Sequence, residues 1–195
     1  MKIPSIERCY ALMVDMAMPD HIVAHSRRVC QVAMLMVDHL PAEETRVNRE
    51  LIQASALLHD ITKNRSFTTR ENHATSGARF LETLGYPEVG AVVGQHVTLD
   101  SYDPAGSPGE AEIVNYADKR VLHDRVVPLE DRMRYIMNRY GRSENDRRRI
   151  RCLWKATETL EKKLFGFLTF SPNQLTENLM PFFTQNSFDR KRPLI

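Results

Sequence analysis

Three short stretches of the sequence place side chains that bind metal ions at positions where a helix should be apolar. These side chains are His25, His59 and Asp118, and each lies on the apolar stripe of a predicted helix. His25, for example, shares its stripe with Val29 and Val32. An ionised Asp that is buried alone is unstable unless it takes up a proton. A divalent metal ion shared by three helices is the simplest partner for such groups.

Asp60 directly follows His59, and this pair offers two ligands from one helix. Neighbouring residues of a helix point about 100° apart, so both side chains can reach one ion at the helix edge. Imidazole and carboxylate ligands without thiolates are typical of reactive sites rather than of structural zinc. We therefore expect a divalent metal ion (Mn, Fe, Ni, Co, Zn or Mg), with open positions for water and for substrate oxygens.

Three cationic side chains near these ligands are candidates for binding a phosphate group: Lys63, Arg65 and Arg120. Lys63 follows His59 by four residues at a predicted helix end, where it either complements the helix dipole or binds the substrate. The two arginines are weaker candidates because most arginines are solvated. The loop at 100–109, rich in Gly and Pro, is the candidate for a lid over the site.

Helical periodicity dominates the chain, and no β-alternation, internal repeat or low-complexity segment is found. The polar stretch Thr62–Asn72 is predicted to be a loop, and Gly85-Tyr86-Pro87 a helix stop. The polar, basic tail from Gln185 has the character of a disordered terminus. Helices are predicted at about 5–17, 20–40, 48–61, 72–84, 87–98, 110–123, 128–140 and 143–165, with a short one from Pro172 to about Pro181.

The bulk composition is that of one soluble globular domain, with 195 residues, 42% hydrophobic and 27% charged. A net charge of +2 gives no electrostatic argument for a nucleic-acid partner. The three cysteines lack CxxC spacing, which argues against a disulfide framework and fits a reducing compartment. Glu7, Arg8 and Asp15 interrupt the first apolar stretch, which is therefore neither a signal peptide nor a membrane span. We expect a cytoplasmic protein without a membrane partner.

The order of His25, the pair His59-Asp60 and Asp118 resembles the HD-domain superfamily of metal-dependent phosphohydrolases. The surrounding residues agree, because apolar residues precede the His-Asp pair and a lysine follows it. The pattern is also similar to the HDIG subgroup, although Thr62 stands where that motif has Gly. Four ligands in this order and in these helical contexts are a specific signal, which a lone His-Asp pair is not.

The resemblance covers about residues 20–125 and implies an all-α fold. In that fold an orthogonal helical bundle holds the metal between its helices and carries additional C-terminal helices. We expect the phosphohydrolase domain to span 1–142 and residues 143–195 to form a helical extension that packs on it. Contact in a homodimer and closure of the bundle are the two roles considered for this extension.

His73 and His96 extend the pattern, since both face inward by helical spacing. In a binuclear branch of the superfamily, histidines in similar contexts bind a second metal ion that shares the Asp of the His-Asp pair. The nearest resemblance is to the bacterial HD-type hydrolases that split diadenosine tetraphosphate symmetrically, although Val97 stands where that family usually has Thr. The resemblance implies one or two ions, with Asp60 as the shared ligand. Substrate contact and helix capping are the other roles open to the two histidines.

The resemblance implies a phosphohydrolase that uses metal-activated water to cleave a phosphoester or phosphoanhydride bond. Asp60 is expected to act as a metal ligand, and Lys63 to stabilise charge on the phosphoryl oxygens. A small phosphorylated molecule, a nucleotide or dinucleotide, is the substrate class that the family implies. The alternative is a non-catalytic HD module with a regulatory or ligand-binding role. A third interpretation, an all-helical interaction protein with structural histidines, predicts no metal content.

Overall fold

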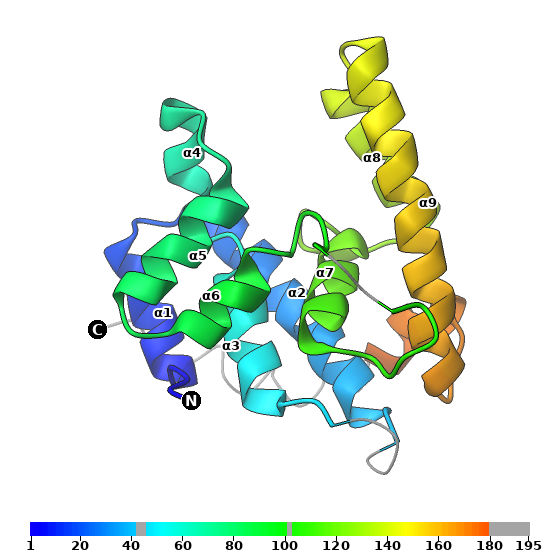
Figure 1. Ribbon diagram of the computed structural model, residues 1–195, viewed down its shortest axis with the longest axis horizontal. Helices are drawn as coiled ribbons and strands as arrows, with labels where there is room; N and C mark the ends of the chain where they lie inside the picture. Colours follow the sequence, from blue (N-terminus) through cyan, green and yellow to red (C-terminus); the bar gives the residue numbers. More distant parts are fainter. Residues whose placement is uncertain (42–45, 101–102, 180–195) are drawn as a thin grey trace.

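The computed structural model describes residues 1–41, 46–100 and 103–179, and this part of the chain is mostly helical (Figure 1). The predicted all-α fold is confirmed. Two short strands form an antiparallel hairpin in which Val121 pairs with Val126. In chain order, the elements are α1 (Ile6–Asp15), α2 (Asp20–Asp38), α3 (Arg49–Leu58), α4 (Lys63–Thr69), α5 (His73–Thr83), α6 (Pro87–Val93), α7 (Glu110–Lys119), β1 (Val121–Leu122), β2 (Arg125–Val126), α8 (Leu129–Tyr140), α9 (Glu144–Phe167) and the 3-10 helix η1 (Pro172–Gln174).

Local side-chain chemistry fixes the starts of several helices. Four of them begin after a residue whose side chain accepts a backbone N–H of the first turn: Ser5, Asn48, Asn72 and Ser143. Between α5 and α6, Gly85 adopts a φ of 81° and Pro87 opens the next helix. This is the helix stop that the sequence predicts at that position.

Three helices end three to five residues before the predicted limit. The prediction extends too far because buried residues continue beyond the last helical turn. The helices α3, α6 and α7 end at Leu58, Val93 and Lys119. Ile61 follows α3 and is still buried, and Val121 is buried in strand β1. A pattern of burial therefore does not reveal where the backbone leaves the helix.

The prediction of a loop over Thr62–Asn72 is wrong for most of that stretch, since Lys63–Thr69 form α4. None of the residues of α4 is buried, so this helix has no apolar stripe for a sequence pattern to reveal. It ends at Arg70, whose φ of 59° is left-handed.

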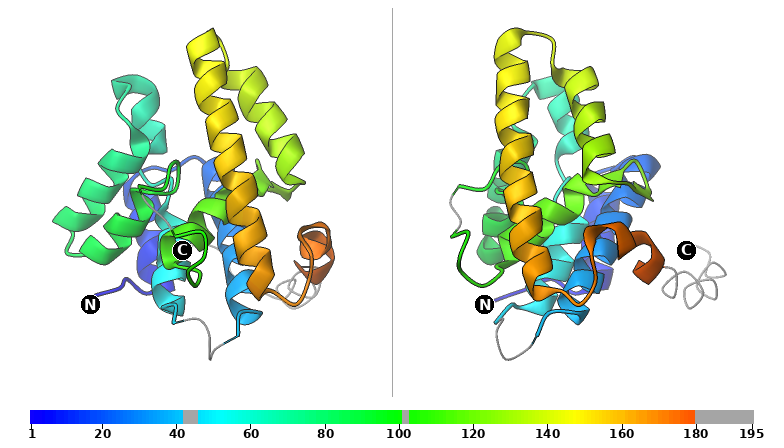
Figure 2. Two further views of the ribbon diagram at one scale, coloured as in Figure 1. Left: turned by 45° about the vertical axis from the view of Figure 1, so that its right-hand side comes forward. Right: turned by 90° about the vertical axis from the view of Figure 1, so that its right-hand side faces the viewer.

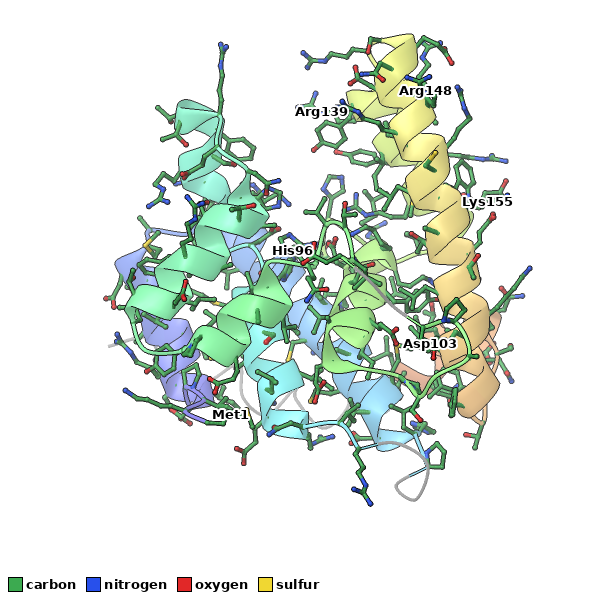
Figure 3. The ribbon with its side chains drawn as sticks, viewed as in Figure 1. Met1, His96, Asp103, Arg139, Arg148 and Lys155 are labelled. Carbon is green, nitrogen blue, oxygen red and sulfur yellow. The ribbon has the colours of Figure 1, made fainter. Side chains whose placement is uncertain are left out.

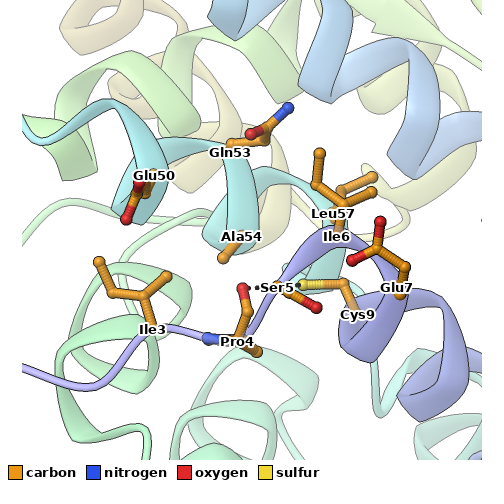
Figure 4. Close-up of a pocket in the computed structure, with 10 residues that line it drawn as sticks. All are labelled: Ile3, Pro4, Ser5, Ile6, Glu7, Cys9, Glu50, Gln53, Ala54 and Leu57. Carbon is orange, nitrogen blue, oxygen red and sulfur yellow. Dashed lines mark hydrogen bonds between the residues drawn. The ribbon is translucent and has the colours of Figure 1, made fainter.

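Helix α2 lies at the centre of the bundle and contacts α3, α7 and the β-hairpin (Figure 1). Its core face contains Val29, Val32 and Met36, none of which is exposed to solvent. Helix α3 also packs against α1 and α6, and α5 packs on α6. Figure 4 shows the pocket where the N-terminal segment and α1 meet α3, with the thiol of Cys9 donating to the carbonyl of Pro4 (3.9 Å). The apolar core thus fixes α2, α3 and α7, which carry or precede His25, the pair His59-Asp60 and Asp118.

Helices α8 and α9 form an antiparallel pair that projects from the bundle (Figure 2). Helix α9 also contacts α7, and Leu160 and Leu164 belong to the same apolar core as the central helices. The described part of the predicted extension 143–195 therefore lies against α7 as well as α8. The predicted end of the last helix at Pro181 and the tail from Gln185 lie outside the described residues.

Arg120 ties this helical pair to the bundle through several acceptors. Its Nε donates to the carbonyl of Val127 (2.9 Å), and its Nη2 donates to that of Pro172 (2.9 Å). Its Nη1 lies 3.3 Å from Oε2 of Glu161 and also donates to the hydroxyl of Tyr116. The side chain is buried, so these acceptors replace its lost contacts with water. Arg120 thus links α7 to α9 and η1.

Gly90 lies where the backbones of α5 and α6 approach closely. A Cβ at Gly90 would lie 2.7 Å from the carbonyl oxygen of Ala78, whereas one at Gly166 in α9 would meet no atom within 4 Å. We expect Gly90→Ala to lower the free energy of unfolding by about 1–3 kcal/mol, because the two helices must separate. Gly166→Ala is the control and should raise it by up to about 1 kcal/mol, since Ala favours the helix. Urea denaturation measures both, and equal stability of the two variants would contradict the packing argument.

Arg120→Ala should lower the free energy of unfolding by about 3 kcal/mol, because it leaves the carbonyl groups of Val127 and Pro172 without their donor and removes the cationic partner of Glu161. The control is Arg125→Ala, at an exposed position of β2, which should change stability by less than about 0.5 kcal/mol. Thermal unfolding of both variants tests this expectation. Unchanged stability together with a loss of activity would instead assign Arg120 to the substrate.

Candidate metal centre

His25 lies on the buried face of α2. Its Nδ1 donates to the carbonyl of His123 (2.7 Å), in the turn of the β-hairpin. The φ of His123 is 57°, an uncommon value for a residue other than glycine. This carbonyl orients the ring so that Nε2 points inward, 3.0 Å from Oδ1 of Asp118. The β-hairpin thus positions the first predicted ligand.

His59 and Asp60 lie in the turn that joins α3 to α4, and they are 0% and 1% exposed. The Nδ1 of His59 donates to the carbonyl of Ala56 in the last turn of α3 (2.8 Å). The carboxylate of Asp60 accepts at Oδ2 from the ammonium group of Lys63 (2.6 Å). The pair therefore faces the interior from a turn, rather than from the helix that the sequence predicts.

Thr62, which stands where the HDIG motif has Gly, connects this turn to α5. Its Oγ1 donates to the carbonyl of His73 (2.8 Å) and lies 2.9 Å from Oγ of Ser76. Thr62 itself is buried. The departure from the motif thus supplies a hydrogen bond that holds His73, the first residue of α5, against the turn of the His-Asp pair.

His96 lies in the turn after α6 and is almost fully buried. Its Nδ1 donates to the carbonyl of Val93 (2.7 Å), and its own carbonyl accepts from Asn115 (3.1 Å) and Lys119 (2.8 Å) of α7. Figure 3 shows His96 where the segment after α6 faces α7. These contacts bring its Nε2 to within 3.1 Å of Nε2 of His73.

Asp60 stands between two groups of ligand atoms. Its Oδ2 lies 3.4 Å from Nε2 of His59 and 4.0 Å from that of His25. Its Oδ1 lies 3.3 Å from Nε2 of His73 and 3.6 Å from that of His96. Within each group the ligand atoms lie within 4.8 Å of one another. One carboxylate therefore faces both pairs of histidines.

Asp118, on α7, adjoins the first group. Its Oδ1 lies 3.0 Å from Nε2 of His25 and 3.8 Å from that of His59, while its Oδ2 accepts from Lys119 (2.8 Å). The structure thus brings together all the residues predicted as ligands: His25, His59, Asp60, His73, His96 and Asp118.

This donor set fits divalent metal ions. Nε2 of His59 and Oδ1 of Asp60 are buried and have no hydrogen-bond partner. Because the Nδ1 atoms of His25, His59 and His96 donate to backbone carbonyls, each Nε2 carries a lone pair in the neutral imidazole. These lone pairs face carboxylate oxygens, and buried acceptors that face one another need a cation between them. Imidazole and carboxylate ligands together suit transition metal ions.

The titration of the cluster agrees with this chemistry. Burial raises the pKa of Asp60, but the charges of His59 and Lys63 outweigh burial and hold that pKa well below its usual range. Burial likewise raises the pKa of Asp118, and Lys119 outweighs it. Burial lowers the pKa of His96 to about 4. The cluster therefore offers ionised carboxylates and, at His96, a neutral imidazole at pH 7, which are the forms that bind metal. Burial lowers the pKa of His59, but Asp60 outweighs burial and raises it, so metal binding at His59 would compete with a proton.

Of the three predicted cations, Lys63 is the one whose charge lies at the cluster, and its side chain is 28% exposed. Arg65 lies on the exposed side of α4 and pairs with Glu71 (2.6 Å). Arg120 uses its donors in the tie to α9 and η1. The structure therefore does not bring the two arginines to the ligands.

Two further cations at the cluster are absent from the sequence prediction, Lys119 and Arg132. Lys119 directly follows Asp118, and this adjacency is a signal that the sequence contains. Arg132 of α8 places its Nη2 3.9 Å from Oδ1 of Asp118. No motif surrounds Arg132, and its position depends on how α8 packs on α7. Sequence periodicity carries no information on that packing.

The predicted lid at 100–109 is tied to α9 in its described part. The carbonyl of Asp103 accepts from Lys163 of α9 (2.7 Å). Figure 3 shows Asp103 beside α9 and apart from His96. Residues 101–102 lie outside the described residues. The contact of Asp103 therefore ties this part of the loop to α9, whereas the N–H of Asp100 donates to Gln95, beside His96 (3.3 Å).

Comparison with known proteins gives two relatives. The chain is 31% identical over 144 residues to a protein of Picrophilus torridus named tRNA (cytidine(56)-2'-O)-methyltransferase, a match that covers 67% of this chain and 40% of that protein. It is 26% identical over 144 residues to an uncharacterized protein of Methanocaldococcus jannaschii, covering 67% of this chain and 84% of the other. No solved structure gives a significant match. Neither name is that of a diadenosine tetraphosphate hydrolase, so the resemblance to those enzymes stays a prediction.

The described residues contain no helix with the length and apolar character that crossing a bilayer requires. Residues 22–121 match the model of the HD domain family. This range is about half of the chain, and it holds His25, the pair His59-Asp60 and Asp118 in the arrangement described above. The chain belongs to the HD domain family, whose superfamily comprises metal-dependent phosphohydrolases.

Proposed function

We propose that the protein is a metal-dependent phosphohydrolase that cleaves a phosphoester or phosphoanhydride bond with water. The observation that carries this proposal is the buried carboxylate of Asp60, which lies between two pairs of histidines and has one oxygen without a hydrogen-bond partner. A purely structural Asp would have its acceptors satisfied by protein donors. The carboxylate instead faces imidazole lone pairs, as a metal ligand does.

Two ions are the loading that the donor atoms support best. His25, His59, Asp60 and Asp118 would hold one ion, and His73, His96 and the second oxygen of Asp60 would hold the other. Divalent ions in such sites act as Lewis acids on phosphoryl oxygens and activate water at neutral pH. The carboxylate of Asp60 would fix the separation of the two ions, because it faces both groups of histidines.

The exposed members of the cluster indicate where the substrate enters. Lys63 and His73 have side chains that are 28% and 25% exposed, whereas His59, His96 and Asp60 are almost fully buried. Lys63 therefore stands at the solvent side of the ligands. Burial lowers the pKa of Lys63, but Asp60 and Asp118 outweigh burial and raise it. The ammonium group stays charged at neutral pH and can stabilise the charge that develops on the phosphoryl oxygens.

A nucleotide or dinucleotide is the proposed substrate, and the likeness to diadenosine tetraphosphate hydrolases around His73 and His96 supports it. A cytoplasmic location and a small phosphorylated partner, rather than a nucleic acid, belong to the same proposal. One observation favours the alternative of a regulatory or ligand-binding HD module. The Picrophilus relative is named for methyl transfer and not for hydrolysis, and this chain spans 40% of its length.

A hydrolysis screen separates the two functions. Metal-free protein is loaded with Mn, Fe, Ni, Co, Zn or Mg and tested on mononucleotides, dinucleoside polyphosphates, cyclic dinucleotides and a generic phosphodiester. Turnover of any substrate that depends on the metal and disappears in Asp60→Ala supports the hydrolase. Metal binding without turnover of any substrate would favour the non-catalytic module.

The donor atoms predict two ions per chain, which can be lost one at a time. His73→Ala and His96→Ala should each remove the ion that these histidines share, and His25→Ala should remove the other, because the two groups have Asp60 alone in common. Elemental analysis and calorimetric titration with Mn measure the stoichiometry. Exposed His21→Ala is the control and should keep both ions. A single ion in the unmodified protein at saturating metal would contradict the binuclear arrangement.

Substitution should also separate metal binding from turnover. Asp60→Ala should abolish both, since both ions lose a ligand. Lys63→Ala should keep the metal content and lower turnover by roughly tenfold to a thousandfold, as expected for one lost electrostatic donor. Lys155→Ala, on the exposed surface of α9, is the control and should change neither. Loss of the metal in Lys63→Ala would show that Lys63 holds the ligands instead of the substrate.

A further inference from the structure

Arg132 reaches the ligand cluster from α8, which lies beyond the range 22–121 that the HD domain model matches. Its side chain is 12% exposed, and its Nη2 lies 3.9 Å from Oδ1 of Asp118. Its Nε is buried and has no hydrogen-bond partner. A guanidinium is therefore brought to the edge of the cluster without the acceptor that its Nε requires.

The contact with Asp118 does not satisfy Arg132. A separation of 3.9 Å is too long for a hydrogen bond, so the two charges interact through space alone. Oδ2 of Asp118 already accepts from Lys119, and its Oδ1 lies 3.0 Å from Nε2 of His25. Leaving a buried donor of a charged group unpaired is costly. The guanidinium thus has an anion nearby but no hydrogen-bonded acceptor for its Nε.

Arg120 shows what a structural arginine looks like in the same molecule. Its Nε, Nη1 and Nη2 all donate to acceptors of the chain, among them the carboxylate of Glu161. Arg132 is nearly as well enclosed, but its Nε has no such acceptor. The difference points to an acceptor that comes from a bound molecule.

The base of α8 holds Arg132 in place. Met133 is fully buried and Leu129 nearly so, and the guanidinium lies 5.8 Å from the ring centre of Tyr135. Helix α8 also contacts α7, the helix of Asp118. Arg132 thus has a position fixed by packing, which a residue that orients a substrate requires.

We propose that Arg132 binds a phosphoryl oxygen of the substrate beside the metal ligands, together with Lys63; this inference rests on the proposed function. The two cations flank Asp60 and Asp118, so metal ions that neutralise these carboxylates would leave both cations for an anion. The planar guanidinium suits phosphate because it donates two parallel hydrogen bonds.

Binding of inorganic phosphate to the Mn-loaded protein tests the inference without a known substrate. Arg132→Met should keep the metal content and the unfolding temperature and should weaken phosphate binding about tenfold to a hundredfold, as expected for a lost charge-assisted hydrogen bond. Arg132→Lys should restore part of the affinity. Arg134→Met is the matched control, because Arg134 pairs with Glu130 on the exposed face of the same helix, and it should bind phosphate normally.

Three outcomes would overturn the assignment: unchanged phosphate binding in Arg132→Met, loss of metal in that variant, and no phosphate binding by the unmodified protein at millimolar concentration. Loss of metal would mean that Arg132 positions Asp118. The same experiments distinguish failure of this inference from failure of the hydrolase proposal. If phosphate binding depends on Arg132 but no phosphorylated substrate is turned over, Arg132 keeps its role and the protein is a binding module. If a substrate is hydrolysed with equal KM and kcat in Arg132→Met, the hydrolase stands and this inference falls.

Discussion

The burial of one charged carboxylate, that of Asp60, is the constraint on which the site depends. Asp60 is 1% exposed and its pKa lies well below the usual range, so the charge must be balanced inside the protein. Three histidines and one lysine lie within 3.6 Å of its oxygens, and they come from four different segments between α3 and α7. The packing of α5 and α6 on the bundle, including the close approach at Gly90, delivers two of these histidines. The arrangement of helices is thus organised around a buried charge as much as around apolar residues.

Hydrogen-bond satisfaction distinguishes the polar groups that hold the ligand cluster in place from those that face into it. Arg120, Lys119 and the Nδ1 atoms of the histidines have acceptors within the chain, and they hold helices or rings in place. His59 Nε2 and Asp60 Oδ1, together with Arg132 Nε, lack partners although they are buried. These unsatisfied atoms gather around one small volume. A metal ion would satisfy the two acceptors, and a phosphate group would satisfy the guanidinium donor.

The sequence predicts the order of the helices and the inward position of the ligands, because both depend on local spacing along the chain. It does not predict α4, whose exposed residues leave no stripe, or the turn that holds His59 and Asp60, since burial continues through it. Arg65 and Arg132 show the limit most clearly. Arg65 is near Lys63 in sequence but lies on the exposed side of α4, whereas Arg132 is distant in sequence and lies at the ligands. The packing of α8 on α7 places Arg132 at the ligands, and no short sequence motif indicates this long-range contact.

The long sequence separation between the candidate ligands has a consequence for when a metal ion could bind. His25 and Asp118 are 93 residues apart, and the carbonyl of His123 that orients His25 lies later still. An unfolded chain therefore offers no ready site, and an ion cannot nucleate this fold as zinc does in small finger domains. The folded bundle balances the two carboxylates without an ion, because Lys63 donates to Asp60 and Lys119 donates to Asp118. Binding of an ion would therefore follow the docking of α7 and the β-hairpin, which bring His25 and Asp118 together.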